Sequence, residues 1–180
     1  MHTPRSTPFF PRARKAAAVA SAAVLGATLL TAAPVQAAPA APAAPALAAQ
    51  PSKARVAKQK SRANYAVRYA YKQIGDRYRY GGTGPSSWDC SGLAGGSWKK
   101  AGVKMPRTTQ QIYRGIKYKV SWKGAEAGDL LFFYKGRTHV GIYVGKGYMI
   151  HAPGSGRRVK KVKLNSYYKR QFSGGVRPGY

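Results

Sequence analysis

The chain has 180 residues, of which 32 are Lys or Arg and only four are Asp or Glu, so its formal net charge at pH 7 is +28. Its single cysteine, Cys90, excludes a fold stapled by disulfides within the chain. A charge of this size predicts anionic partners, of which nucleic acid is the usual one for so basic a protein.

The first 37 residues have the pattern of a secretory signal peptide. They begin with a basic segment, whose charged residues are Arg5, Arg12, Arg14 and Lys15. An alanine-rich apolar run over residues 16–33 follows, and small residues continue to Ala37. The run is too weakly apolar for a retained spanning helix, which needs about 20 strongly apolar residues. We expect cleavage near Ala37, export, and no stable membrane anchor afterwards.

Export changes which polyanions this basic protein meets. In a bacterial envelope they are phosphate-rich wall polymers, carboxylate-bearing peptides and anionic lipids, so we expect no nucleic acid partner. The basic residues are scattered along the chain rather than clustered on one helix. Two interpretations of the charge therefore stay open: adhesion to an anionic matrix, or a solvated surface whose like charges repel one another.

Residues 38–60 are predicted to form a linker. Ala and Pro dominate residues 38–51, and a polar, basic stretch continues to Lys60. This composition buries little and favours an extended or disordered segment. The remaining residues, 61–180, are numerous enough for one compact domain with its own core.

Three helices are predicted in the first half of this domain. Apolar residues at helical spacing run through residues 61–74, and a glycine follows as a stop. A second helix starts at Cys90, with Asp89 as its N-cap, and ends near Ala101. Residues 108–115 have capping-box spacing ahead of apolar side chains and predict a short third helix.

The second half of the domain changes to short segments that are rich in β-branched and aromatic residues and separated by turn formers. They predict strands at residues 129–134, 139–145, 147–151 and 158–164, with a further strand near 172–178. Helices followed by strands indicate an α+β fold, in which the helices pack on an antiparallel sheet.

Three side chains suggest chemistry, because the exported chain would keep one thiol, Cys90, and two imidazoles, His139 and His151. A thiol nucleophile needs a base, and the base works better when a third group orients its ring. The first turn of a helix favours the thiolate of Cys90, since the positive end of the helix dipole lies there. Asp89 is a negative neighbour that opposes this effect, so we assign it to capping and substrate contact.

The two histidines lie on neighbouring predicted strands. A three-residue loop at residues 144–146 would place His139 directly opposite His151, with Cβ atoms roughly 5 Å apart on one face. A two-residue loop would place the two rings on opposite faces. The inference of a histidine pair therefore depends on the register of this hairpin.

Two other interpretations of these residues stay open at this point. Cys90 would be an inert buried thiol and each histidine an ordinary strand residue, or the three would form a metal site with an open position. The sequence separations of 49 and 12 residues match no short ligand pattern, which argues against a metal.

Five segments taken together resemble the NlpC/P60 family of secreted cell-wall peptidases: YRYGGTGPSSWDCSGL, PRTTQQ, GDLLFF, HVGIYVG and MIHAP. The resemblance runs through nearly all of residues 61–180. It implies a papain-like α+β catalytic domain, located outside the cell or on the wall. It also implies a cysteine endopeptidase that cuts peptidoglycan stem peptides, commonly between D-glutamate and the diamino acid, through a thioester and without metal or cofactor.

By the same resemblance, Cys90 is the nucleophile, His139 the general base and acid, and His151 the residue that orients that base. The backbone N–H of Cys90 is a candidate oxyanion donor. A second set of positions holds the free amine of the stem peptide in some members: Tyr78, Asp89 and Ser91. We expect a monomer. Alternative functions are a non-catalytic binding protein for anionic wall polymers, or an amidase or acyl transferase with the same Cys and His chemistry.

Gly95 and Gly96 depart from the family, whose members tend to carry larger residues there inside the nucleophile's helix. Two interior glycines cost a helix on the order of 2 kcal/mol. Either this helix is weakened, or its backbone closely approaches another part of the chain.

Overall fold

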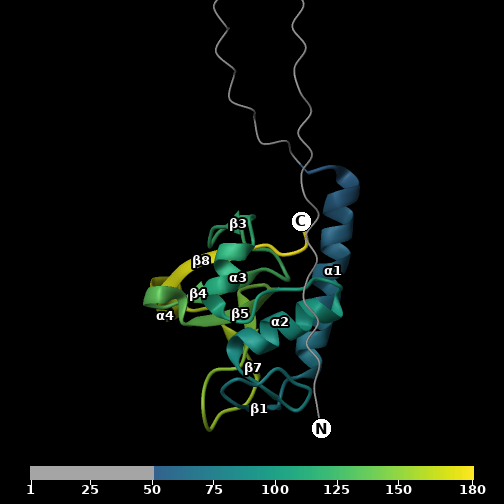
Figure 1. Ribbon diagram of the computed structural model, residues 1–180. Helices are drawn as coiled ribbons and strands as arrows, with labels where there is room; N and C mark the ends of the chain where they lie inside the picture. Colours follow the sequence, from purple (N-terminus) through teal and green to yellow (C-terminus); the bar gives the residue numbers. More distant parts are fainter. Residues whose placement is uncertain (1–50) are drawn as a thin grey trace, which may run out of the picture. The chain divides into compact units, whose positions relative to one another are not determined.

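The computed structural model describes residues 51–180 (Figure 1). The expected signal peptide and the Ala/Pro-rich segment up to residue 50 lie outside the described residues. Within residues 51–180, no helix combines the length and the apolar character needed to span a membrane.

The first helix, α1, spans Lys53–Lys72 and begins well before the expected boundary. Ser52 caps it by accepting a backbone N–H of the first turn. Residues 53–60 carry mostly unbranched side chains, which favour helix, and the buried Gln59 donates to the carbonyl of Pro178 at 3.1 Å. The expectation of a disordered linker is therefore wrong for residues 53–60, because these turns are helical and contact the C-terminal segment.

The other two expected helices are confirmed. Helix α2 spans Cys90–Lys100, and Asp89 caps it by accepting a backbone N–H of its first turn. Helix α3 spans Thr109–Gly115, and Thr108 and Gln111 form both reciprocal hydrogen bonds of a capping box. Local cap chemistry therefore fixes where each of these helices begins.

The C-terminal half forms a six-stranded sheet in the order β3-β8-β4-β5-β6-β7, in which every neighbouring pair is antiparallel. Helices α1 and α2 pack against each other and against β5, as Figure 1 shows. The predicted α+β fold is thereby confirmed. The strands are β3 (Lys119–Val120), β4 (Leu130–Phe133), β5 (His139–Gly145), β6 (Tyr148–His151), β7 (Lys160–Lys163) and β8 (Phe172–Val176).

The sequence pattern missed several short elements. Strands β1 (Arg77–Tyr78) and β2 (Ser87–Trp88) form a small parallel sheet in the loop before α2. Helix α4 (Ser166–Gln171) and the 3₁₀ turn η1 (Lys135–Arg137) connect strands of the large sheet. Elements this short contain too few residues to display a hydrophobic period, which explains why the pattern did not predict them.

The core lies between the helices and the sheet. The buried Ala63, Ala66 and Ala70 give α1 a face of small side chains. Trp98 of α2 is fully buried and donates from its Nε1 to the carbonyl of Gly128 at 3.1 Å. The bond from Trp98 therefore ties α2 to the segment just before β4, whose four residues are all buried as well.

The two glycines of α2 have different surroundings. A Cβ atom at Gly96 would lie 2.6 Å from Cζ3 of the buried Trp88, whereas a Cβ atom at Gly95 meets no atom within 4 Å. Gly96 is therefore required because the helix closely approaches Trp88. Gly95 carries no such requirement.

Substitution of these neighbouring glycines is expected to have opposite effects on stability. Gly95→Ala should raise the free energy of unfolding by about 1 kcal/mol, because alanine favours a helix interior. Gly96→Ala should lower it by roughly 1–3 kcal/mol, because the added methyl group forces Trp88 to shift. Denaturant unfolding of both variants measures the difference, and equal effects at the two positions would contradict this account of the packing.

Candidate active site

Cys90 is the first residue of α2, and its half-buried, free thiol borders a cleft of about 520 Å³. The loop before α2 supplies Tyr78 and Tyr80 to this cleft, and the segment that leads into α3 supplies Arg107. Thr138, the residue before β5, lines it as well. The predicted nucleophile therefore lies in an open concave site rather than in the core.

Burial raises the pKa of the Cys90 thiol, and the negative charge of Asp89 adds to the rise. The backbone N–H groups of Val140 and Ser91 oppose it, because they can donate to the sulfur. Helix α2 packs against β5, the strand that carries His139. Burial outweighs these N–H groups, so the pKa of Cys90 rises overall, whereas the helix start was expected to lower it.

His139 and His151 lie on β5 and β6, and their rings meet with 2.8 Å between Nε2 of His139 and Nδ1 of His151. The expected direct pairing across the hairpin is wrong, however. Ile142 pairs with Ile150, so His151 comes beside Gly141 instead, where a Cβ atom would lie 3.5 Å from that of His151. The two rings therefore meet along a diagonal of one sheet face, which aromatic side chains can span.

The hairpin reaches this arrangement by a route that the sequence did not predict. Its turn has two residues, Lys146 and Gly147, with φ values of 53° and 74°, and Gly145 pairs with Tyr148 across it. Such a turn was expected to put the histidines on opposite faces. A register shift between Tyr143 and Gly145 inserts one extra residue into β5 and restores the shared face.

Burial lowers the pKa of His139 to about 4 and that of His151 to about 3, where the positive charges of His139, Lys160 and Arg157 contribute further. Both rings are therefore neutral at pH 7. When His139 donates from Nε2 to His151, its Nδ1 is left as a proton acceptor. The same tautomer places a proton on the buried Nε2 of His151, which has no hydrogen-bond partner among the described residues.

Asp89 has its acceptor sites filled by protein donors. Its Oδ1 accepts from the Gly92 N–H at 2.7 Å, the Ser91 hydroxyl at 3.1 Å and Arg107 at 3.1 Å. Its Oδ2 accepts from the Gly81 N–H at 3.0 Å and again from Arg107. Burial alone would raise the pKa of Asp89, but the Arg107 guanidinium and the other donors outweigh it and lower that pKa. Asp89 thus holds the start of α2 and the neighbouring loop together.

Arg107 is a site residue that the sequence analysis did not single out. Its guanidinium bonds to Asp89 and, at 2.9 Å, to the Ser91 hydroxyl, while part of the side chain stays exposed in the cleft. Its partner lies 18 residues away, on another element. The one available signal was the scarcity of acids, since a chain with four carboxylates is expected to pair each of them with a cation.

The three positions expected to hold a substrate amine, Tyr78, Asp89 and Ser91, all line the same cleft as Cys90. Burial raises the pKa of Tyr78, and its neighbours Cys90 and Asp89 add to the rise. Within residues 51–180, no group of three or more His, Cys, Asp or Glu side chains is arranged to hold a metal ion.

The sequence profile described as the NlpC/P60 family matches residues 75–177, and the chain belongs to this family. A probable endopeptidase of Corynebacterium glutamicum is 41% identical over 97 residues, which cover 53% of this chain and 46% of that protein. The bifunctional muramidase/DL-endopeptidase CwlT of Bacillus subtilis is 45% identical over 103 residues, which cover 54% and 31%. The chain thus spans less than half of the length of these relatives.

Solved structures agree with this assignment. An NlpC/P60 family protein from Bacillus cereus superposes with a TM-score of 0.62 at 29% identity, covering 66% of this chain and 40% of that one. The NlpC/p60 domain of the peptidoglycan hydrolase SagA gives a TM-score of 0.57 at 35% identity, covering 63% and 97%. The papain-like α+β fold expected for the family is therefore the fold of this chain.

Proposed function

We propose that this protein is a secreted cysteine endopeptidase that acts in the cell wall and hydrolyses peptidoglycan stem peptides. The observation that carries the proposal is the packing of α2, which begins with Cys90, against β5, whose His139 is paired with His151. Relatives named as endopeptidases support this substrate class. One of them is named a DL-endopeptidase, which favours the bond between D-glutamate and the diamino acid.

In the proposed mechanism, Nδ1 of His139 takes the thiol proton as the sulfur of Cys90 attacks the amide carbonyl carbon. The backbone N–H of Cys90 donates to the oxyanion that develops on the carbonyl oxygen. The C–N bond then breaks, and His139 gives its proton to the leaving amine. The acyl group remains on sulfur as a thioester.

In the second half of the reaction, His139 removes a proton from water, whose oxygen attacks the thioester carbonyl. The C–S bond breaks, the product leaves as a carboxylic acid, and the proton returns from His139 to the Cys90 sulfur. His151 accepts the Nε2–H of His139 and keeps that ring oriented throughout. All protons are carried by these side chains and by water, so the scheme uses no metal or cofactor.

In this proposal, the substrate amine contacts Tyr78 and Ser91. Asp89 takes a different role from the one that the family resemblance implied, because its carboxylate already accepts five protein donors. It acts as a positioning residue that holds Ser91 and Arg107 at the edge of the cleft.

The test is a digestion of purified peptidoglycan with the full chain, beside the Cys90→Ala variant, followed by mass spectrometry of the released fragments. Fragments that end in a new D-glutamate carboxyl group, from the wild type alone, are the expected result. Fragments from both proteins would contradict the proposed nucleophile. If neither protein releases fragments and both stay bound to the wall, a binding protein is favoured. Transfer of the acyl group to an added amine would favour an acyl transferase.

A further inference from the structure

A cavity of about 850 Å³, larger than the cleft beside Cys90, lies at the other end of α2. It is lined by the N-terminal half of α1, the loop after α2, the segment after α3 and the C-terminal residues 177–180. Figure 1 shows the C-terminal end beside α1. No residue lines both sites, and α2, whose 11 residues span about 16 Å, lies between them.

We name this cavity the basic pocket, because it is lined by many cations. Five of them form no ion pair and no side-chain hydrogen bond within residues 51–180. Like charges in a concave surface reinforce one another and concentrate anions there. The five residues are Arg55, Lys58, Arg62, Lys104 and Lys117.

Within residues 51–180, none of the acidic side chains pairs with these five cations. It contains only four acidic residues. Asp89 pairs with Arg107, and Glu126 and Asp129 both pair with Arg177. The last, Asp76, accepts the Nε1–H of the buried tryptophan of β2 at 2.9 Å. None of the four acidic side chains, all of which lie in the described part of the chain, therefore neutralises the cations of the basic pocket.

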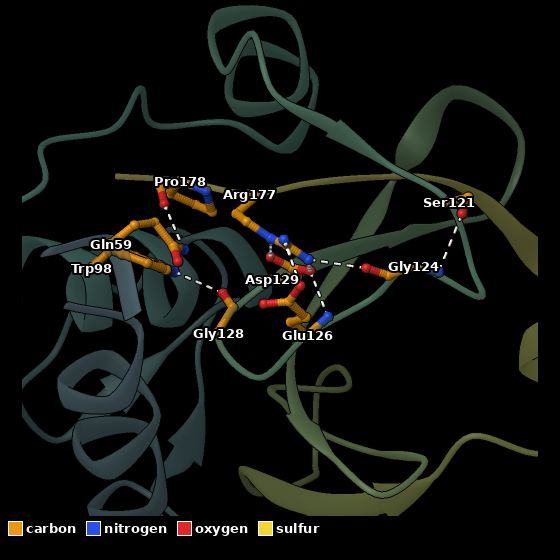
Figure 2. A network of polar contacts seen from close by, with 9 residues as sticks. All are labelled: Gln59, Trp98, Ser121, Gly124, Glu126, Gly128, Asp129, Arg177 and Pro178. Atoms are coloured by element: carbon orange, nitrogen blue, oxygen red, sulfur yellow. Dashed lines mark hydrogen bonds and ion pairs between the residues drawn. The ribbon is translucent and has the colours of Figure 1, made fainter. Parts of the chain in front are cut away.

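One residue of the lining of the basic pocket is held by a network of hydrogen bonds and ion pairs, which Figure 2 shows. Arg177, which also lines the pocket, bonds to Asp129 and Glu126 at 2.8–2.9 Å and donates to the Gly124 carbonyl at 2.9 Å. The C-terminal segment is tied to α1 by the hydrogen bond from Gln59 to Pro178. The backbone beneath the pocket is thus fixed, so a ligand that binds here orders mainly the exposed Lys and Arg side chains.

One wall of the basic pocket is aromatic. Tyr118 and Tyr180 stack with ring centroids 4.8 Å apart and an interplanar angle of 23°, and both line the cavity. Such a pair offers an apolar face beside the cations. The surroundings therefore suit a ligand in which charged groups alternate with short carbon-containing units.

We propose that the basic pocket is a second binding site, separate from the catalytic cleft, for an anionic polymer linked by phosphodiester groups. Five cations on several walls of the pocket match a ligand that carries several negative charges in succession rather than one. Phosphate presents oxygen atoms in several directions and so can bond to Arg and Lys from different walls. A flat membrane surface is disfavoured, because the cations line a recess between elements. Polymer bound here leaves the Cys90 cleft open.

The test compares two triple variants with the same loss of charge. Lys58→Gln/Arg62→Gln/Lys117→Gln removes cations of the basic pocket, whereas Lys163→Gln/Lys169→Gln/Arg170→Gln removes exposed cations elsewhere. Binding of synthetic poly(glycerol phosphate) to the full chain is measured over a range of salt concentrations. The pocket variant should bind at least about tenfold more weakly, with a shallower salt dependence, since fewer counterions are released. The control variant should bind nearly as the wild type does.

Equal weakening in both variants would overturn the proposal, because net charge alone would then explain binding. A pocket variant that keeps its polymer binding but loses binding to phosphatidylglycerol vesicles would overturn it in favour of a membrane partner. The pocket variant should hydrolyse a short soluble stem peptide at the wild-type rate, and a loss there would show that the two sites are not separate. Binding of the polymer is read without hydrolysis, so failure of the proposed peptidase activity leaves this result intact.

Discussion

Replacement of Cys90 by alanine is expected to lower kcat/KM for stem-peptide hydrolysis by at least about 10⁴-fold, because the proposed thioester cannot form without the sulfur. His139→Ala should lower it by roughly 10²–10⁴-fold, the usual contribution of a general acid and base. The double variant should be no less active than Cys90→Ala alone, because the two groups act as one unit. Single-turnover kinetics with a short stem peptide measure all three losses.

The control for these losses of activity is a measurement that each variant is still folded. Cys90 is half-buried and its thiol forms no disulfide, so Cys90→Ala is expected to change the free energy of unfolding by less than about 1 kcal/mol. An unfolded variant would make the activity result meaningless, and denaturant unfolding excludes this. If the decrease in kcat/KM in the double variant equals the product of the two single decreases, Cys90 and His139 act independently. That result would contradict the proposed mechanism, in which they act as one unit.

The start of α2 shows what local sequence can predict. An aspartate followed by the cysteine and small residues is a cap signal, and the structure places the Asp89 carboxylate on the Gly92 N–H. The capping box at Thr108 and Gln111 is a second example. Such contacts join residues within one turn, so the sequence carries all the information that they need.

The histidine pair shows where local information ends. A shared face for His139 and His151 was predicted only for the case of a three-residue loop and direct pairing. The structure instead has a two-residue turn and a register shift between Tyr143 and Gly145. A register shift depends on how the strand packs on its neighbours, which no short segment encodes. The two rings therefore meet, but through a register that the sequence did not indicate.

The helical start of α1 and the role of Arg107 were missed for a similar reason. The composition of residues 53–60 indicated a polar linker, but in the structure Gln59 donates to the carbonyl of Pro178, 119 residues away. Arg107 donates to Asp89, which lies 18 residues earlier in the chain. Both are tertiary contacts, which a short segment of sequence does not reveal, and at residues 53–60 the contact adds to a local preference for helix.

The protonation state of the cleft decides the pH dependence of the reaction. Burial lowers the pKa of His139 to about 4 and raises that of Cys90, so the resting pair is a neutral imidazole and a thiol. The base is lost only when His139 is protonated. The acid limb of kcat/KM is therefore expected near pH 4, well below the usual imidazole pKa of about 6.5. The alkaline limb is expected above the usual thiol range.

Stability should change over a neighbouring pH range, and the sign follows from the same shifts. Both histidines have folded-state pKa values, about 4 and about 3, below their value in the unfolded chain. The unfolded chain therefore binds more protons below about pH 6.5, and stability decreases as the pH falls from there. Circular dichroism at each pH identifies the range in which the protein stays folded, and the kinetic limb is read only within that range.

The pH profile of kcat/KM, measured together with the ultraviolet absorbance of the thiolate, tests this account of the site. No thiolate absorbance is expected at pH 7, and its rise with pH should coincide with the alkaline limb. Thiolate that is already present at neutral pH would mean that Cys90 and His139 rest as an ion pair, with the positive end of α2 outweighing burial. An acid limb near pH 6.5 in folded protein would mean that solvent reaches His139 and that the pairing with His151 does not exclude it.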